Sequence, residues 1–313
     1  MVYAYGVTLP GTYHIKNDIV CQDAHEIIKC GDDMLIAAVA DGLGSETHSD
    51  VASKMAADLS TEHCRQHITQ TSGSDEILEV IRASFAIAQQ AIEHEAESND
   101  HDIAQYDTTL SLAVYIGDTL YYGHSGDGGI VVLTADGRYE SVTEQQRDEE
   151  ARVFPLFFED MWSFGQFDKK VCSVFLATDG IYETFFPYLI KNEPVNIHIS
   201  LAQFFMDNRG LQIDELGEAA VQSRIEDFMN NIPDEQVNDD KTVVVLLNTS
   251  VQFTPQPDEY YKEPDWAGLK RRHDEEWKRQ AYPHLFRGDE PEEEPCENTG
   301  DALCTETETA DFQ

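Results

Sequence analysis

Five aspartates stand beside short apolar runs that have the composition of buried strands: Asp23, Asp41, Asp127, Asp179 and Asp239. The clearest is Asp41, which ends the apolar run 34–40 and is followed by Gly42-Leu43-Gly44. A carboxylate at the end of a buried strand is held rigidly, and the glycines allow the backbone to turn sharply and approach a ligand closely. Oxygen donors arranged in this way suit hard cations such as Mg²⁺ and Mn²⁺.

A single Asp-Gly pair at the end of a strand is weak evidence for a metal site, because Asp and Gly are also common in ordinary turns. Asp23 taken alone would be an ordinary surface carboxylate. Repetition of the pattern at the edges of several strong β runs is harder to explain by turns. Clustered carboxylates repel one another unless cations neutralise them. We therefore expect a binuclear or trinuclear divalent-metal site at the edge of a β-sandwich.

The chemistry that fits such a site is hydrolysis of a phosphate ester. Two neighbouring divalent ions can lower the pKa of a bound water molecule, and they can also hold a tetrahedral phosphate. The chain has 60 acidic and 21 basic residues and a net charge of −39. This balance argues against nucleic acid and anionic membranes as partners, since both need basic patches. It is compatible with divalent cations or basic partners.

Strands and helices must position these aspartates. Hydrophobic patterning predicts strands at 34–40, 108–116, 120–124, 130–133, 171–177 and 242–247, with a hairpin through Gly117-Asp118. Residues 1–30 are expected to form short strands with a loop between them. Spacings of three and four predict a helix that begins near Ser49 and further helices at about 75–97, 199–207 and 214–230. For 134–170, a helical flap and a loop packed over the site both remain open.

The composition divides the chain into a domain of residues 1–250 and a charged, acidic tail of residues 251–313. Residues 289–313 carry ten acidic residues and neither Lys nor Arg, which is typical of a solvated, disordered segment. The six cysteines form no CxxC pair, so reduced thiols in a cytoplasmic protein are expected rather than disulfides or a zinc site. From the absence of a charged and then apolar opening segment we expect no secretory leader, and no apolar run reaches the length of a membrane span.

The order of these motifs resembles the PPM, or PP2C-type, metal-dependent protein phosphatases, over about residues 1–248. Cys21-Gln22-Asp23-Ala24 resembles the family element (E/Q)DA, and residues 39–44 resemble DGxGG. Thr108-Thr109 resembles the paired small residues that open a middle strand. Gly126-Asp127 resembles GDSR, residues 177–183 resemble SDGhhD, and residues 239–245 resemble the closing DNxTVhhh.

The resemblance implies an α+β fold: a four-layer α/β/β/α sandwich of two antiparallel sheets flanked by helices. It also implies two Mn²⁺ or Mg²⁺ ions, and a third in many members. Asp41 would bridge the two catalytic ions, and the carbonyl of Gly42 would bind one of them. Asp23 would hold metal-bound water, and Asp179 and Asp239 would bind the other ion. Asp127 matches a ligand of the third, weaker ion.

The chain departs from the family pattern in several places. Gln22 stands where Glu is frequent, Leu43 where many members have His, and Gly129 replaces the Arg of GDSR. The Arg that holds the substrate phosphate is missing upstream of Asp23, and His14 or Lys16 could substitute. Lys lacks the planar fork of Arg, so the grip on phosphate would be looser.

These features predict a divergent, bacterial-type Ser/Thr protein phosphatase in the cytoplasm. Its substrate would be a phosphorylated protein, and its counterpart a cognate Ser/Thr kinase. Two alternatives remain open: a catalytically weak pseudophosphatase that acts as a regulatory binding module, and a phosphatase for small molecules.

Overall fold

The computed structural model describes residues 1–44 and 46–285, which contain two antiparallel five-stranded sheets. The first sheet has the order β1-β10-β9-β6-β7, formed by Val2–Leu9, Lys241–Asn248, Val171–Ala177, Gly129–Thr134 and Tyr139–Ser141. The second has the order β2-β3-β4-β5-β8, formed by Asp23–Cys30, Met34–Asp41, Leu110–Ile116, Thr119–Ser125 and Ser163–Gln166.

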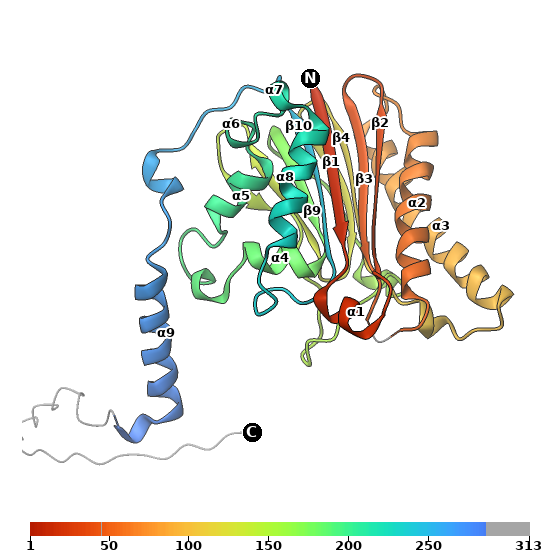
Figure 1. The fold of residues 1–313 in the computed structure, drawn as a ribbon. Coiled ribbons are helices and arrows are strands. Elements are labelled where there is room, and N and C mark those ends of the chain that lie inside the picture. Colours follow the sequence, from red (N-terminus) through yellow and green to blue (C-terminus); the bar gives the residue numbers. More distant parts are fainter. Residues whose placement is uncertain (45, 286–313) are drawn as a thin grey trace, which may run out of the picture. The chain divides into compact units, whose positions relative to one another are not determined.

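Helices cover the outer face of each sheet (Figure 1). The second sheet is covered by the long helices α2 (Ser49–His67) and α3 (Ser74–Ser98). The first sheet is covered by α4 (Asp179–Phe185), α5 (Ile199–Met206), α6 (Asn208–Leu211), α7 (Ile213–Leu216) and α8 (Glu218–Asn230). The four layers confirm the α/β/β/α sandwich expected from the sequence.

Strand β3 shows why an unbroken apolar run is needed in this architecture. Leu35, Ala37 and Val39 face the other sheet, where they join a buried cluster with residues of β4, β6, β9 and β10. The alternate residues Ile36 and Ala38 face α2 and α3. Because successive side chains of a strand point to opposite faces, a strand that is covered on both faces is apolar throughout.

The expected hairpin through Gly117-Asp118 is confirmed, since β4 and β5 pair with Ile116 opposite Thr119. The expected loop in residues 1–30 is wrong in part, because Thr12–Asn17 form the short helix α1. Its C-cap, Asp18, adopts the left-handed conformation (φ 58°) that commonly ends a helix. The sequence patterns therefore did not predict the six-residue helix α1.

The segment 134–170 takes neither of the two expected forms alone. It supplies the edge strand β7 to the first sheet and the edge strand β8 to the second. A 3₁₀ turn at Glu159–Met161 precedes β8. The segment therefore links the outer edges of both sheets. This arrangement depends on long-range pairing, for which a local sequence pattern gives no signal.

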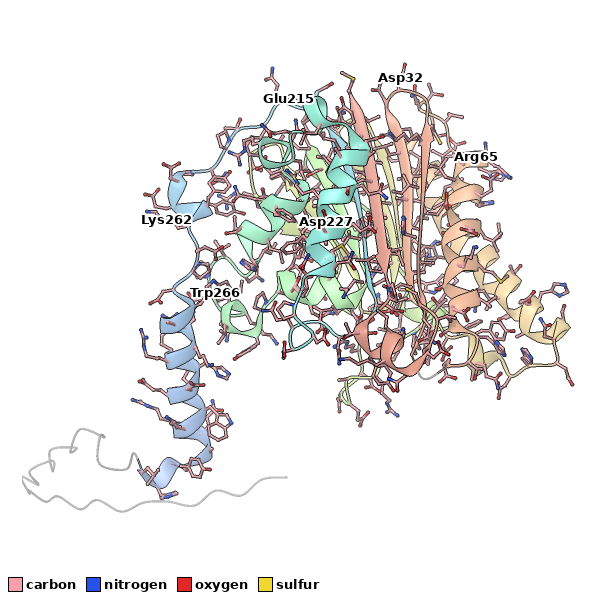
Figure 2. The ribbon with its side chains drawn as sticks, in the orientation of Figure 1. Asp32, Arg65, Glu215, Asp227, Lys262 and Trp266 are labelled. Carbon is pink, nitrogen blue, oxygen red and sulfur yellow. The ribbon has the colours of Figure 1, made fainter. Side chains whose placement is uncertain are left out.

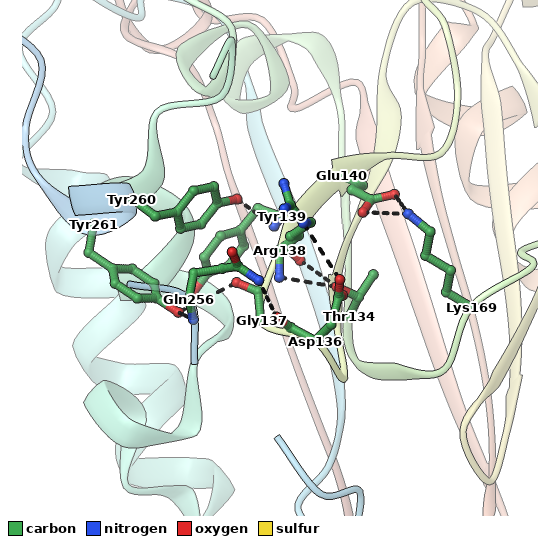
Figure 3. Close-up of polar contacts among 10 residues, drawn as sticks. All are labelled: Thr134, Asp136, Gly137, Arg138, Tyr139, Glu140, Lys169, Gln256, Tyr260 and Tyr261. Carbon is green, nitrogen blue, oxygen red and sulfur yellow. Dashed lines mark hydrogen bonds and ion pairs between the residues drawn. The ribbon is translucent and has the colours of Figure 1, made fainter. Parts of the chain in front are cut away.

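Residues 251–264, beyond the last strand, pack against the hairpin between β6 and β7 (Figure 3). The backbone N–H of Tyr139 donates a hydrogen bond of 2.9 Å to the hydroxyl of Tyr260, and Gln256 Nε2 donates one of 2.5 Å to the carbonyl of Asp136. These contacts belong to a compact unit that runs from Met1 to Pro264.

A second unit starts at Asp265 and contains helix α9 (Trp266–Ala281). Asp265 caps this helix, because its side chain accepts a hydrogen bond of 2.9 Å from the backbone N–H of Gly268. The acidic stretch 289–313 lies outside the described residues. The assignment of residues 251–313 as a charged, acidic tail remains a proposal.

Figure 2 labels charged side chains on three of the outer helices, Arg65 on α2, Glu215 on α7 and Asp227 on α8. Arg65 on α2 and Asp227 on α8 are both exposed. Within residues 1–44 and 46–285, we find no helix whose length and hydrophobicity would let it cross a membrane.

We expect Leu35→Ala to lower the free energy of unfolding by about 2–5 kcal/mol, because it leaves a cavity between the sheets. The matched control is Leu216→Ala, since Leu216 is 49% exposed whereas Leu35 is fully buried. The control should change the free energy by no more than about 0.5 kcal/mol. Urea unfolding of the three proteins measures the difference. Equal losses in both variants would contradict the assigned core.

Candidate metal and phosphate site

The five aspartates of the sequence pattern meet at one edge of the sandwich, where strands of both sheets end. Asp23 and Asp41 lie directly opposite each other across β2 and β3. Asp127 follows β5, Asp179 follows β9 as the first residue of α4, and Asp239 precedes β10. The sandwich therefore brings together side chains that are more than 200 positions apart in the sequence.

Four of these aspartates, all except Asp23, line a cleft of about 120 Å³. Its walls are formed by His14, Gln22, Asp41, Gly42, Leu43, Gly44, Thr109, Asp127, Val153, Asp179, Asp239 and Asp240. Asp23 is buried next to it, where its Oδ2 accepts a hydrogen bond of 2.7 Å from the Thr178 hydroxyl.

Backbone contacts fix the position of Asp41. Its N–H donates to the hydroxyl of Thr109 at 3.0 Å, and its carbonyl accepts from the N–H of Thr109 at 2.8 Å and from the hydroxyl of Thr108 at 2.9 Å. At the next position, a Cβ on Gly42 would lie 2.5 Å from the carbonyl oxygen of Ser49. The turn therefore requires glycine because the start of α2 packs directly against it.

The donor atoms suit a hard divalent cation. Carboxylate oxygens of Asp41, Asp127 and Asp179 lie within 4.8 Å of one another. Asp239 and Gly42 line the same cleft. These carboxylate and carbonyl oxygens fit Mn²⁺ or Mg²⁺ better than zinc or copper, which favour nitrogen and sulfur.

The proximity of the carboxyl groups changes their protonation. Burial raises the pKa of Asp41 well above its ordinary value, and the charges of Asp23, Asp179 and other aspartates raise it further. Burial likewise raises the pKa of Asp179 to about 7, with added shifts from Asp127 and Asp239. The pKa of Asp127 is raised by burial, although Arg147 partly opposes the shift. Without cations, this site resists full ionisation.

The two candidate phosphate-binding residues lie in different surroundings. His14 is buried, lines the cleft, and has its Nδ1 2.8 Å from Asp240 Oδ1, although the angle is poor for a hydrogen bond. The ammonium group of Lys16 is 2.8 Å from Asp234 Oδ2, and its side chain is 69% exposed. The structure thus brings His14, and not Lys16, to the wall of the cleft.

Sequence reasoning missed Asp240 and Arg147. Asp240 accepts hydrogen bonds of 2.6 Å from the backbone N–H groups of Gly11 and Gln22, so it joins the start of α1 to the cleft. A second acid directly after Asp239 was the available signal. Arg147 contacts Asp127 and Asp179. Its only signal was that it is the one basic residue among residues 144–150.

The chain belongs to the protein phosphatase 2C family, whose model matches residues 10–230. This membership confirms the family expected from the motifs and with it the enzyme class, a protein phosphatase. No protein of curated function matches the sequence closely enough to count as a relative.

Several solved structures share the fold at low identity. A bacterial serine phosphatase is 14% identical, with a TM-score of 0.54 over 79% of this chain and 98% of that one. The serine/threonine phosphatase Stp1 from Staphylococcus aureus is 16% identical, with a TM-score of 0.53 over 79% of this chain and 95% of that one. The Mycobacterium tuberculosis serine/threonine phosphatase PstP/Ppp is 16% identical, with a TM-score of 0.52 over 79% and 98%. The resemblance confirms the fold.

We expect the stability of the metal-free protein to fall as the pH rises from about 4 to about 7. Asp179 has an ordinary pKa of 3.8 and a folded-state pKa of about 7, so in this range the folded state binds more protons than the unfolded state. Its stabilising protonation is complete below pH 4 and is lost as the pH rises through 7. Melting temperatures in EDTA at pH 5 and pH 7.5 measure the change.

The variant Asp179→Asn serves as the control, because it removes the titrating group and its repulsion. Its melting temperature should depend less steeply on pH in the same range. Identical pH dependence in the parent and the variant would contradict the crowding of charge at this site.

Proposed function

We propose that the cleft hydrolyses phosphoserine and phosphothreonine in proteins with the help of two Mn²⁺ or Mg²⁺ ions. The observation that carries this proposal is the meeting of Asp41, Asp127 and Asp179 within 4.8 Å at the common edge of both sheets. An ordinary turn aspartate would not be placed beside two others in this way. Membership of a phosphatase family supports the same chemistry.

Asp41, Asp179 and Asp239 would hold the divalent ions, together with the carbonyl of Gly42. Bound divalent ions supply positive charge for the phosphate and lower the pKa of a water molecule. Asp23, held by the Thr178 hydroxyl, would accept a hydrogen bond from water at the site. All of these residues stand at ends of strands or in the adjoining turns, so little reorganisation is needed when substrate binds.

His14 would contact the substrate phosphate. Asp240 Oδ1, 2.8 Å from its Nδ1, would place a carboxylate beside the imidazole ring. Asp240 is itself held by the backbone of Gly11 and Gln22, which makes this arrangement rigid. The pair would replace the arginine that is missing from the first strand region.

The partners follow from this activity. A protein phosphatase of this class would act on phosphorylated proteins and oppose a Ser/Thr kinase. We also propose a cytoplasmic location, which the free thiols of Cys21, Cys30, Cys64 and Cys172 support. Hydrolysis rates on phosphopeptides and nucleotides would separate a protein phosphatase from a small-molecule phosphatase, and absence of metal-dependent turnover would indicate a pseudophosphatase.

We expect Asp179→Asn to lower kcat on a phosphothreonine peptide by about 100-fold or more, because one ligand of the ions is lost. EDTA should remove the activity of the parent and Mn²⁺ should restore it. The matched control is Asp227→Asn on the exposed face of α8, which should keep full activity. Normal turnover by a folded Asp179→Asn protein would rule out the proposed site.

We expect His14→Ala to raise KM for a phosphopeptide by about 10-fold, since a charge-assisted hydrogen bond contributes roughly 1.5–3 kcal/mol. Lys16→Ala should leave KM unchanged, because Lys16 contacts Asp234 at the surface. Steady-state kinetics on both variants decide between the two residues. A larger effect of Lys16→Ala would assign the phosphate contact to that residue instead.

A further inference from the structure

Arg147 places a positive charge at the site from a segment that the metal motifs do not include. Its Nε and Nη2 donate to Oδ2 of Asp127 at 2.9 and 2.6 Å. The same Nη2 lies 2.8 Å from Glu183 Oε1 and 3.4 Å from Asp179 Oδ2. One guanidinium group therefore contacts three carboxylates.

The position of Arg147 is fixed by the loop that carries Asp127. The side chain of Gln145 donates a hydrogen bond of 2.6 Å to the carbonyl of Asp127. Gln146 exchanges two hydrogen bonds with Gly126, from its N–H to the glycine carbonyl at 2.8 Å and from the glycine N–H to its Oε1 at 3.0 Å. Arg147 thus lies beside Asp127, and its side chain is 30% exposed.

The backbone at Gly126, directly before Asp127, is also constrained. Its φ of 113° is accessible to glycine, and a Cβ there would lie 2.5 Å from the side chain of Thr109. The position before Asp127 therefore requires glycine for the turn that presents Asp127 to Arg147. Since Asp127 is only 2% exposed, its charge needs a fixed counter-charge from within the protein or from an ion.

The guanidinium and an additional divalent ion compete for this carboxylate. Both N–H groups of Arg147 occupy the same oxygen of Asp127, and a cation bound beside them would be repelled. Arg cannot lose its charge near neutral pH, so this competition does not depend on its protonation. The geometry therefore favours Arg147 over a divalent ion as the partner of Asp127.

We propose that Arg147 supplies the positive charge at Asp127 in place of a third divalent ion, so that the cleft takes two ions and not three. This rests on the proposed function of the cleft as a divalent-metal site. Arg147 is in this sense a positioning residue, because it holds Asp127 and Asp179 beside the ions.

Counting bound Mn²⁺ tests the proposal without measuring turnover. Equilibrium dialysis of the full chain, with free Mn²⁺ read by electron paramagnetic resonance, should give about two ions for the parent and about three for Arg147→Ala. The matched control is Arg152→Ala, because Arg152 pairs with Asp148 and Glu150 nearby and is 75% exposed. This control should bind the same number of ions as the parent.

Asp127→Asn gives a second measurement that keeps the arginine. In the parent background it should leave the ion count unchanged, and combined with Arg147→Ala it should remove the additional ion. A lower count for Asp127→Asn alone would show that this carboxylate already binds an ion and would overturn the proposal. An unchanged count in a folded Arg147→Ala protein would do the same. A parent that binds no Mn²⁺ would overturn the metal-dependent function as well.

Discussion

Mutual repulsion between carboxylates is the constraint that the site and its support must overcome. Burial and neighbouring charges raise the pKa values of Asp41, Asp127 and Asp179 together. The sandwich holds them in place because Asp41 ends β3, Asp127 follows β5 and Asp179 begins α4, and these three elements pack into the core. Bound cations would relieve the repulsion between the carboxylates. This relief would strengthen binding, since the carboxylates are already assembled before an ion arrives.

The strands, and the aspartates at their ends, were predictable because a buried strand needs a continuous apolar run, and the end of that run is visible in the sequence. The run 34–40 shows this directly: both faces of β3 are covered, and Asp41 appears where the coverage ends. Helix α3 was equally clear, because Ile77, Ile81 and Phe85 follow the helical period and are buried. The apolar run of β3 and the helical spacing of α3 are local sequence patterns, and such patterns indicate which residues are buried.

Arg147 and His14, which also lie at the site, are not marked by any hydrophobic pattern. Arg147 reaches Asp127 because β7 and β8 tie residues 134–170 to different sheets. His14 reaches the cleft because α1 is fastened to Asp240, which lies far along the chain. Neither contact follows from hydrophobic spacing, because both depend on how distant segments are brought together. The sequence contains Arg147 and His14, but it does not reveal that they contact Asp127 and Asp240.

The pairing of β1 with β10 has a consequence for the order in which the chain folds during synthesis. Strands β2 to β5 are neighbours in sequence and can pair once residue 125 has left the ribosome. Strand β1 must wait for β10, so the first eight paired residues remain without their partner until Lys241–Asn248 emerge. Because Asp239 and Asp240 stand immediately before β10, the cleft is complete only at this last step. A nascent chain therefore completes both the core between the sheets, to which β10 contributes, and the cleft only when β10 emerges.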